Sequence, residues 1–128
     1  MRYGESLIIT RGMSPESKYL EMYSPKAWEE KMAAIEQAFP EGKLKNNFIR
    51  WFVSTAESCE LDTQNRIRIP QHLIDYCGID KDVVLLGCVD RIEVWAKERL
   101  EETETMTEDD FESVFGFLND FKKSKIEG

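Results

Sequence analysis

Two arginines separated by one isoleucine, Arg66 and Arg68, are the side chains in this sequence best suited to binding an anion. They follow a polar turn that contains Asp62, Gln64 and Asn65. Successive side chains on a strand face opposite sides, so both guanidinium groups are expected on one face. A fixed pair of guanidinium groups can hold phosphates, or grip O6 and N7 of guanine in the major groove. The segment is therefore a candidate for contact with nucleic acid.

The same turn also has a purely structural interpretation. Asp62 can accept hydrogen bonds from the turn backbone, and Asn65 tolerates a positive φ. Asp62 would also orient Arg66, and the two could form an internal ion pair on a solvated hairpin that binds nothing. The residue types alone leave both interpretations open.

Composition excludes several other functions. The chain has 128 residues, which suits one compact domain or two small lobes, and its net charge of −8 argues against binding nucleic acid through overall charge. A local basic patch remains compatible with that charge, because phosphate contacts act over a short range. Three cysteines without close pairing and a single histidine predict neither disulfides nor a metal cluster. Without a nucleophile–base constellation or a phosphate loop, we expect no enzyme activity, cofactor or small-molecule substrate.

The pattern of apolar residues predicts a soluble α+β protein. No apolar run approaches the roughly 18 residues that a membrane span needs, and no signal-peptide core is present, so a cytoplasmic protein without a membrane partner is expected. Period-two and continuous apolar runs predict strands at 7–10, 19–23, 83–88 (a buried strand) and 92–95, with two short strands flanking the turn after Asp62. Helical spacing and capping residues predict helices at 25–39, from near 46 to 56, at 71–77, at 96–102 and from 107 onward.

Two parts of the chain share the same order of predicted elements and several matching residues. The strand at 7–9 corresponds to 84–86, and Glu21 and Tyr23 correspond to Glu93 and Trp95. This repetition suggests a duplicated unit. The second copy carries the arginine-bearing hairpin at its front, and the equivalent in the first copy would fall before Met1. A barrel that lacks this part would have unpaired strand edges, which favour pairing between chains.

These residues resemble the MraZ family of bacterial regulators, over about residues 5 to 105. The segments that carry the resemblance are Leu61–Pro70 with Leu73 and Gly78-Ile79, then Val84–Gly87 and Arg91–Trp95, and upstream Leu7–Thr10, Arg11-Gly12, Tyr23, Pro25, Trp28 and Arg50–Phe52. Three features depart from the family pattern. Asn65 replaces the usual glycine, Ile74 stands where arginine is frequent, and the first-copy motif is absent.

The resemblance implies an α+β fold of tandem SpoVT-AbrB-like swapped-hairpin barrel units with flanking helices. Residues 1–56 would form an incomplete first unit with a helical connection, residues 57–106 the second unit, and residues 107–128 an acidic amphipathic helix or tail.

The implied function is sequence-specific DNA binding by a nucleoid-associated homo-oligomer, in the form of a ring. It would act on double-stranded repeats upstream of the cell-division and cell-wall gene cluster. The expected DNA-binding residues are Arg66, Arg68, Asp62, Gln64 and Asn65, with added phosphate contacts from Lys43, Lys45 and Arg50. The rival is an oligomerisation or interaction module that has lost autonomous DNA binding, which the net charge and the missing motif support.

Overall fold

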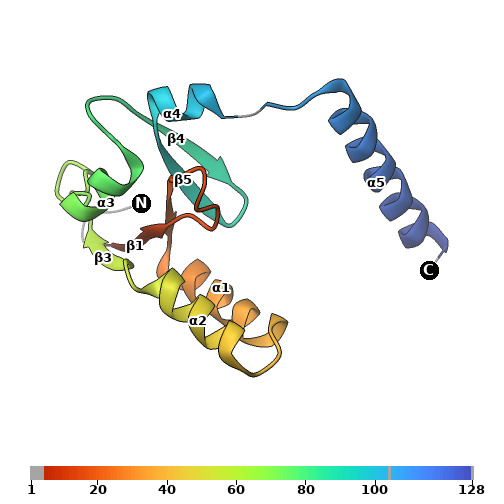
Figure 1. The fold of residues 1–128 in the computed structure, drawn as a ribbon, viewed down its shortest axis with the longest axis horizontal. Coiled ribbons are helices and arrows are strands. Elements are labelled where there is room, and N and C mark those ends of the chain that lie inside the picture. The colour runs from red at the N-terminus through yellow and green to blue at the C-terminus, as the bar shows by residue number, and fades with distance from the viewer. Residues whose placement is uncertain (1–4, 104, 128) are drawn as a thin grey trace.

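The computed structural model describes residues 5–103 and 105–127, and within them one antiparallel sheet of five strands carries the fold (Figure 1). The strand order is β3-β1-β2-β5-β4. The strands are β1 (Ser6–Arg11), β2 (Leu20–Tyr23), β3 (Glu57–Glu60), β4 (Val83–Cys88) and β5 (Arg91–Ala96). The α+β class expected from the sequence is confirmed, whereas the division into tandem units stays a prediction.

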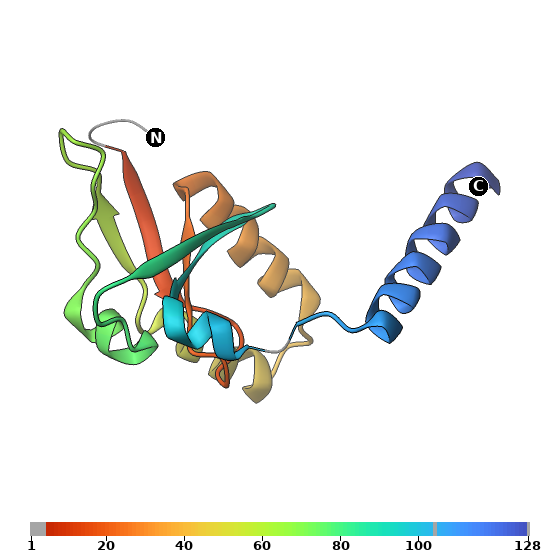
Figure 2. The same cartoon turned by 90° about the horizontal axis from the view of Figure 1, so that it is seen from above.

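Two of the helices form an antiparallel hairpin beside the sheet (Figures 1 and 2). Helix α1 (Pro25–Ala38) begins as predicted, with the Ala27 N–H donating to the Ser24 hydroxyl at 3.1 Å. Helix α2 (Lys43–Val53) begins three residues before the predicted Asn46. The asparagines there resemble a cap, but the backbone carbonyl of Gly42 already accepts the first helical hydrogen bond.

The remaining helices are α3 (Gln71–Cys77), α4 (Lys97–Glu102) and α5 (Glu108–Glu127). Helix α3 follows Pro70 and ends at Gly78, whose φ of 72° places it in the left-handed region that favours glycine. Helix α5 starts with a reciprocal capping box, in which the Thr107 hydroxyl and the Asp110 carboxylate each accept a backbone N–H. The starts of α3 and α5 agree with the sequence prediction. No helix in the described ranges is long and apolar enough to cross a membrane.

Two apolar clusters hold these elements together. The first joins the sheet to α3 through the buried side chains Leu7, Ile9, Leu20, Met22, Leu73, Cys77 and Val94. The second joins β2 to the α1–α2 hairpin through Tyr23, Ile35 and Phe52, with Trp28 stacked on Phe52. The aromatic residues of α2 therefore include core residues.

Strand β4 is present where it was predicted, but the prediction that it is buried is wrong. Leu85 is 58% exposed and Val83 is 44% exposed. Ile9 is the residue of β1 that corresponds to Leu85, because Ile9 pairs with Met22 of β2 and Leu85 pairs with Val94 of β5. In contrast to Leu85, Ile9 is fully buried. Ile9 belongs to the first apolar cluster, with Leu73 and Cys77 of α3, whereas Leu85 does not. In addition, no strand in the described residues pairs with the outer edge of β4.

A buried polar network lies where β2 and β5 pair. Glu21 is directly opposite Glu93, and it accepts hydrogen bonds from the hydroxyls of Tyr19 (2.9 Å) and Tyr23 (2.5 Å). Glu93 accepts from Arg91 (2.8 Å) and from the indole N–H of Trp95 (3.0 Å). Each glutamate is thus held by the residues two positions before and two positions after it.

Charge and stacking tie the two halves of this network together. The Arg91 Nε lies 3.3 Å from the Glu21 carboxylate, and the ring of Tyr19 stacks on Trp95 at 4.6 Å between centroids. Burial, followed by the nearby Glu21 carboxylate, raises the pKa of Tyr19 and of Tyr23 well above the usual value. Both hydroxyls therefore remain protonated donors to Glu21 at neutral pH.

The sheet register bears on the proposed repeat. A local two-fold relation between two copies requires the matched residues Glu21 and Glu93 to face each other, and they do. The register matches Ile8 with Val84, because these residues lie opposite Tyr23 and Trp95 respectively. The alignment of Leu7 with Val84 made from the sequence is therefore shifted by one residue. The duplication itself stays a prediction.

Replacing Glu21 by alanine should destabilise the protein by about 3 kcal/mol. The substitution leaves two buried hydroxyls and part of the Arg91 charge without their acceptor. Urea unfolding followed by circular dichroism measures the change. Glu16→Ala, which removes an exposed carboxylate, is the control and should change the free energy of unfolding by less than about 0.5 kcal/mol. A loss below about 1 kcal/mol for Glu21→Ala would show that the network contributes little.

Candidate nucleic-acid interface

The candidate interface is the segment between β3 and α3, residues 61–70, which we call the arginine loop. Its turn is fixed by Asp62, whose Oδ1 accepts the backbone N–H groups of Gln64 (2.8 Å) and Arg66 (2.9 Å). The backbone closes the same turn, because the Asp62 N–H donates to the Arg66 carbonyl at 2.8 Å. Asn65 has a φ of 59°, which asparagine tolerates better than most residues. Both expectations for the turn are met.

Asp62 also holds the side chain of Arg66. Its Oδ2 accepts a hydrogen bond from the Arg66 Nε at 3.1 Å. The backbone N–H of Arg66 contributes most to holding the pKa of Asp62 below its usual value, with further contributions from the Gln64 N–H and the Arg66 side chain. Asp62 is therefore a carboxylate at neutral pH, and it orients the guanidinium group that follows it.

The internal ion pair and an external contact are compatible with each other. The bond to Asp62 uses only the Nε of Arg66, and neither Nη group has a hydrogen-bond partner among the described residues. The Arg66 side chain is 70% exposed. Its two terminal nitrogens are thus available to a phosphate or to the edge of a guanine.

The alternation predicted for residues 66–69 is present. Arg66 and Arg68 are exposed, whereas Ile67 and Ile69 are partly buried against the first apolar cluster. The prediction that this arm forms a strand is wrong, because the segment has no regular secondary structure. Its isoleucines pack onto the cluster that contains Leu73 of α3, and this contact takes the place of pairing beside β3.

The loop is anchored at both ends. The Leu61 N–H donates to the carbonyl of Glu5, just before β1, and the Leu61 side chain is buried. At the other end, the Pro70 carbonyl accepts the N–H groups of Leu73 and Ile74 as α3 begins. The exposed arginines are therefore carried on a segment whose ends and apolar side chains are fixed to the body.

The three basic residues expected to add phosphate contacts lie on α2. Lys43 is exposed, and Arg50 is exposed and donates to the side chain of Asn47 at 3.2 Å. Lys45 is different: it is 4% exposed, and its Nζ lies 2.7 Å from both Glu36 and Glu41. We therefore remove Lys45 from the proposed DNA contacts, because its charge is already neutralised by two carboxylates. Its salt bridge to Glu36 joins α2 to α1, and the charge pattern alone did not reveal this.

Another arginine, Arg11 at the end of β1, has a structural role. The Arg11 guanidinium lies 4.4 Å from the ring centroid of Trp51 and donates to the Trp51 carbonyl and to the Ser54 hydroxyl (3.0 Å). It therefore ties the end of β1 to the end of α2. The adjacent Gly12 has no room for a side chain, since a Cβ there would lie 2.4 Å from the Tyr19 ring. No sequence motif predicted these contacts.

The described residues contain no group of three or more histidine, cysteine, aspartate or glutamate side chains placed to hold a metal ion. An open pocket of about 1150 Å³ lies between the start of α1 and the β4–β5 turn. Met22, Tyr23 and Ile92 are among the residues that line it, and it does not include the arginine loop. The exposed chemistry that best fits a ligand is thus the pair of arginines.

One family model and several curated proteins match this chain. A family model described as "MraZ protein, putative antitoxin-like" matches residues 52–115, which include the whole arginine loop. Three curated relatives have the name "Transcriptional regulator MraZ". The protein from Natranaerobius thermophilus is 33% identical over 92% of this chain and 80% of its own length. The one from Caldanaerobacter subterraneus subsp. tengcongensis is 35% identical over the same shares, and that from Thermoanaerobacter sp. strain X514 is 34% identical over 91% and 80%. The chain belongs to the MraZ family.

Proposed function

We propose that this protein is a DNA-binding transcriptional regulator that contacts double-stranded DNA through the arginine loop. The observation that carries the proposal is the exposure of Arg66 and Arg68 on a turn that Asp62 fixes. The name shared by the three relatives supports the regulatory role. Lys43 and Arg50 are proposed as additional phosphate contacts, and Gln64 and Asn65 at the tip of the turn as polar contacts.

The net charge of −8 does not exclude this role. Screening limits the interaction between exposed charges to about 10 Å at 0.1 M salt, so carboxylates far from the loop matter little. Much of the acidic charge lies elsewhere, including the first turn of α5 with Glu108, Asp109 and Asp110. Binding is therefore expected to depend strongly on which face meets the DNA, and to weaken as salt rises.

One arginine loop offers few contacts, so useful affinity requires several copies that act together. We propose a homo-oligomer, in the ring form that the family resemblance implies, in which each copy presents its loop to one repeat of the DNA. We also propose that the target lies upstream of the cell-division and cell-wall gene cluster, as the resemblance implies, and that the protein acts at the nucleoid in the cytoplasm. Enzymatic activity has no part in this proposal.

A second candidate function is favoured by the bare edge of β4. Val83, Leu85 and Leu86 are exposed apolar residues on a strand without charged or proline residues, which is an unusual edge for a monomer. Such an edge fits a module that acts mainly by pairing with another protein chain. In that case the arginine loop would be a solvated hairpin, and DNA binding would be absent.

Replacing Arg66 or Arg68 by alanine should weaken binding to the upstream repeats about tenfold or more per residue, because each removes a bidentate contact to phosphate or guanine. Fluorescence-anisotropy titrations at several salt concentrations measure both affinity and salt slope, and the slope should fall by about one if the lost contact is to phosphate. Lys97→Ala, which removes an exposed lysine on α4, is the control and should have little effect. Unchanged affinity and slope in both arginine variants would leave only the second candidate function.

Replacing Asp62 by alanine should also weaken DNA binding, by about fivefold, although it removes a negative charge beside the contact. The reason is that the turn and the Arg66 side chain lose their shared acceptor. Asp80→Ala removes an exposed carboxylate that supports no turn, and it should leave affinity unchanged or slightly raise it. Tighter binding by Asp62→Ala would mean that Asp62 acts only as a repulsive charge.

The bare edge of β4 leads to a prediction about self-association. Leu85→Lys should raise the concentration at which the protein associates about tenfold, because a lysine on an edge strand opposes strand pairing. Sedimentation velocity over a range of concentrations tests this. The Gln37→Lys substitution, at an exposed neutral residue of α1, makes the same charge change outside β4 and is the control. Equal association by both variants would show that β4 is not an interface.

A further inference from the structure

Helix α5 stands away from the rest of the molecule. Figures 1 and 2 both show it beyond α4, joined to the body by a short connecting segment. All of its side chains from Glu108 to Lys125 are exposed. They include six large apolar residues, Phe111, Val114, Phe115, Phe117, Leu118 and Phe121, whose exposure ranges from 38% to 74%. A soluble protein rarely leaves so many aromatic residues in water unless they form an interface.

Five of these residues form a single stripe. Phe111, Val114, Phe115, Leu118 and Phe121 recur at intervals of three and four, so they share one face of the helix. The rings of Phe111 and Phe115 lie against each other along that face, at 6.4 Å between centroids. This is the spacing by which one helix packs against another. The geometry of α5 therefore fits a helical partner.

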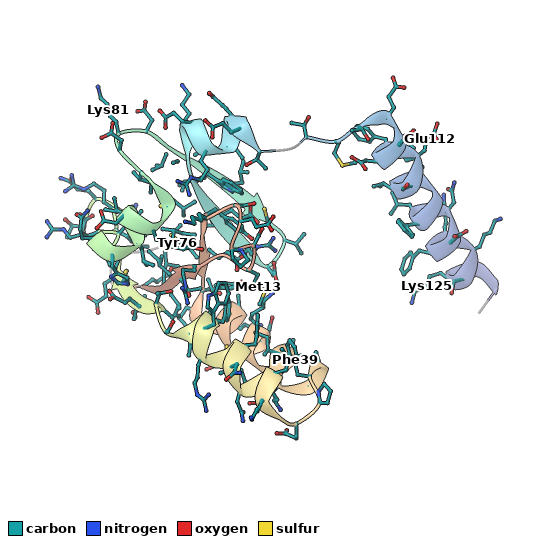
Figure 3. All side chains as sticks on the ribbon, in the orientation of Figure 1. Met13, Phe39, Tyr76, Lys81, Glu112 and Lys125 are labelled. Atoms are coloured by element: carbon teal, nitrogen blue, oxygen red, sulfur yellow. The ribbon has the colours of Figure 1, made fainter. Side chains whose placement is uncertain are left out.

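Charge is distributed unevenly along the same helix. The first turn contains Glu108, Asp109 and Asp110, and Glu112 follows. The last described turns contain Lys122, Lys123 and Lys125, of which Lys122 and Lys125 continue the line of the apolar stripe. Figure 3 shows Glu112 and Lys125 near opposite ends of the helix, with their side chains clear of the body. The Lys125 Nζ lies over the Phe121 ring at 5.5 Å, which places this charge beside the stripe.

This charge pattern determines the direction of a self-pair. In a parallel pair, acidic first turns would face each other, and so would the lysines at the other end. In an antiparallel pair, the acidic turn of each copy meets the lysines of the other, while Phe115 and Leu118 meet near the centre. Opposite charges favour the antiparallel pair, and like charges oppose the parallel one.

We propose that α5 is a self-association element, in which the apolar stripes of two copies pack together as an antiparallel helix pair. The occupant of the stripe is thus α5 of a second copy. This interface is separate from the arginine loop and from the β4 edge, so it could join two copies, or two larger assemblies, without covering either. The proposal does not depend on DNA binding.

Zero-length carbodiimide cross-linking of the full chain tests the orientation. The rise of 1.5 Å per residue places Glu108 and Lys125 about 26 Å apart on one helix, so a direct amide bond between the two ends must join two molecules. Mass spectrometry should find cross-links from the acidic residues 108–112 to the lysines at 122–125, in a species with at least twice the mass of one chain. Their absence, or their occurrence in a species with the mass of one chain, overturns the proposal.

A matched pair of variants tests the stripe itself. Leu118→Glu places a charge at the centre of the stripe and should reduce both the cross-link yield and the affinity of self-association at least tenfold. Ser113→Glu adds the same charge on the opposite face of α5 and should leave both unchanged. Circular dichroism of each variant confirms that the body remains folded. Equal cross-linking and mass in the two variants overturns the proposal.

Other occupants would produce different results. Cross-links from Lys122 and Lys125 to acidic residues of 5–103 would place α5 on the body of the protein. Co-sedimentation with vesicles of phosphatidylcholine and phosphatidylglycerol, without cross-links between helices, would identify a lipid surface. Either result overturns the self-pair. Neither would alter the tests of DNA binding, because Arg66 and Arg68 are not involved.

Discussion

The antiparallel pairing of β2 with β5 is the interaction on which the rest of the structure depends. It places Glu21 opposite Glu93 in the middle of the sheet, and it joins segments more than seventy residues apart. Buried carboxylates are costly unless they are fully hydrogen-bonded, and here two hydroxyls, an indole and one guanidinium group supply the partners. Because these donors flank each glutamate at fixed positions, both carboxylates are hydrogen-bonded in this register, and a shift of one residue would break those bonds.

The sheet and the helix packed on it fix the position of the arginine loop. Strand β3 is paired with β1, Leu61 is buried at the entrance of the loop, and α3 packs on the first apolar cluster at its exit. Between these anchors, Asp62 uses one oxygen for the backbone and the other for Arg66. A charged group that is positioned before it binds loses less conformational entropy on binding. For this physical reason, an exposed arginine beside its own carboxylate is compatible with the proposed DNA recognition.

The exposed edge of β4 and the exposed apolar stripe of α5 differ in chemistry. The edge of β4 offers backbone hydrogen bonds and aliphatic side chains, which suit another strand. Helix α5 has no free backbone groups along its length, and its aromatic stripe and asymmetric charges suit another helix. Both lie outside the arginine loop. In the proposals above, assembly and DNA contact therefore use separate parts of this chain, and several loops could be brought together without being covered.

The sequence by itself determined the α+β class, the starts of α1, α3 and α5, the turn made by Asp62 and Asn65, and the alternation of exposed arginines with isoleucines. These features depend on local rules of capping, helical period and backbone conformation, which neighbouring residues impose. Only the tertiary structure decided that Lys45 is buried between two glutamates, that Leu85 is exposed, and that residues 66–69 form no strand. Each of those outcomes depends on which distant segment lies alongside, because burial and strand pairing are properties of contacts between elements and not of one segment.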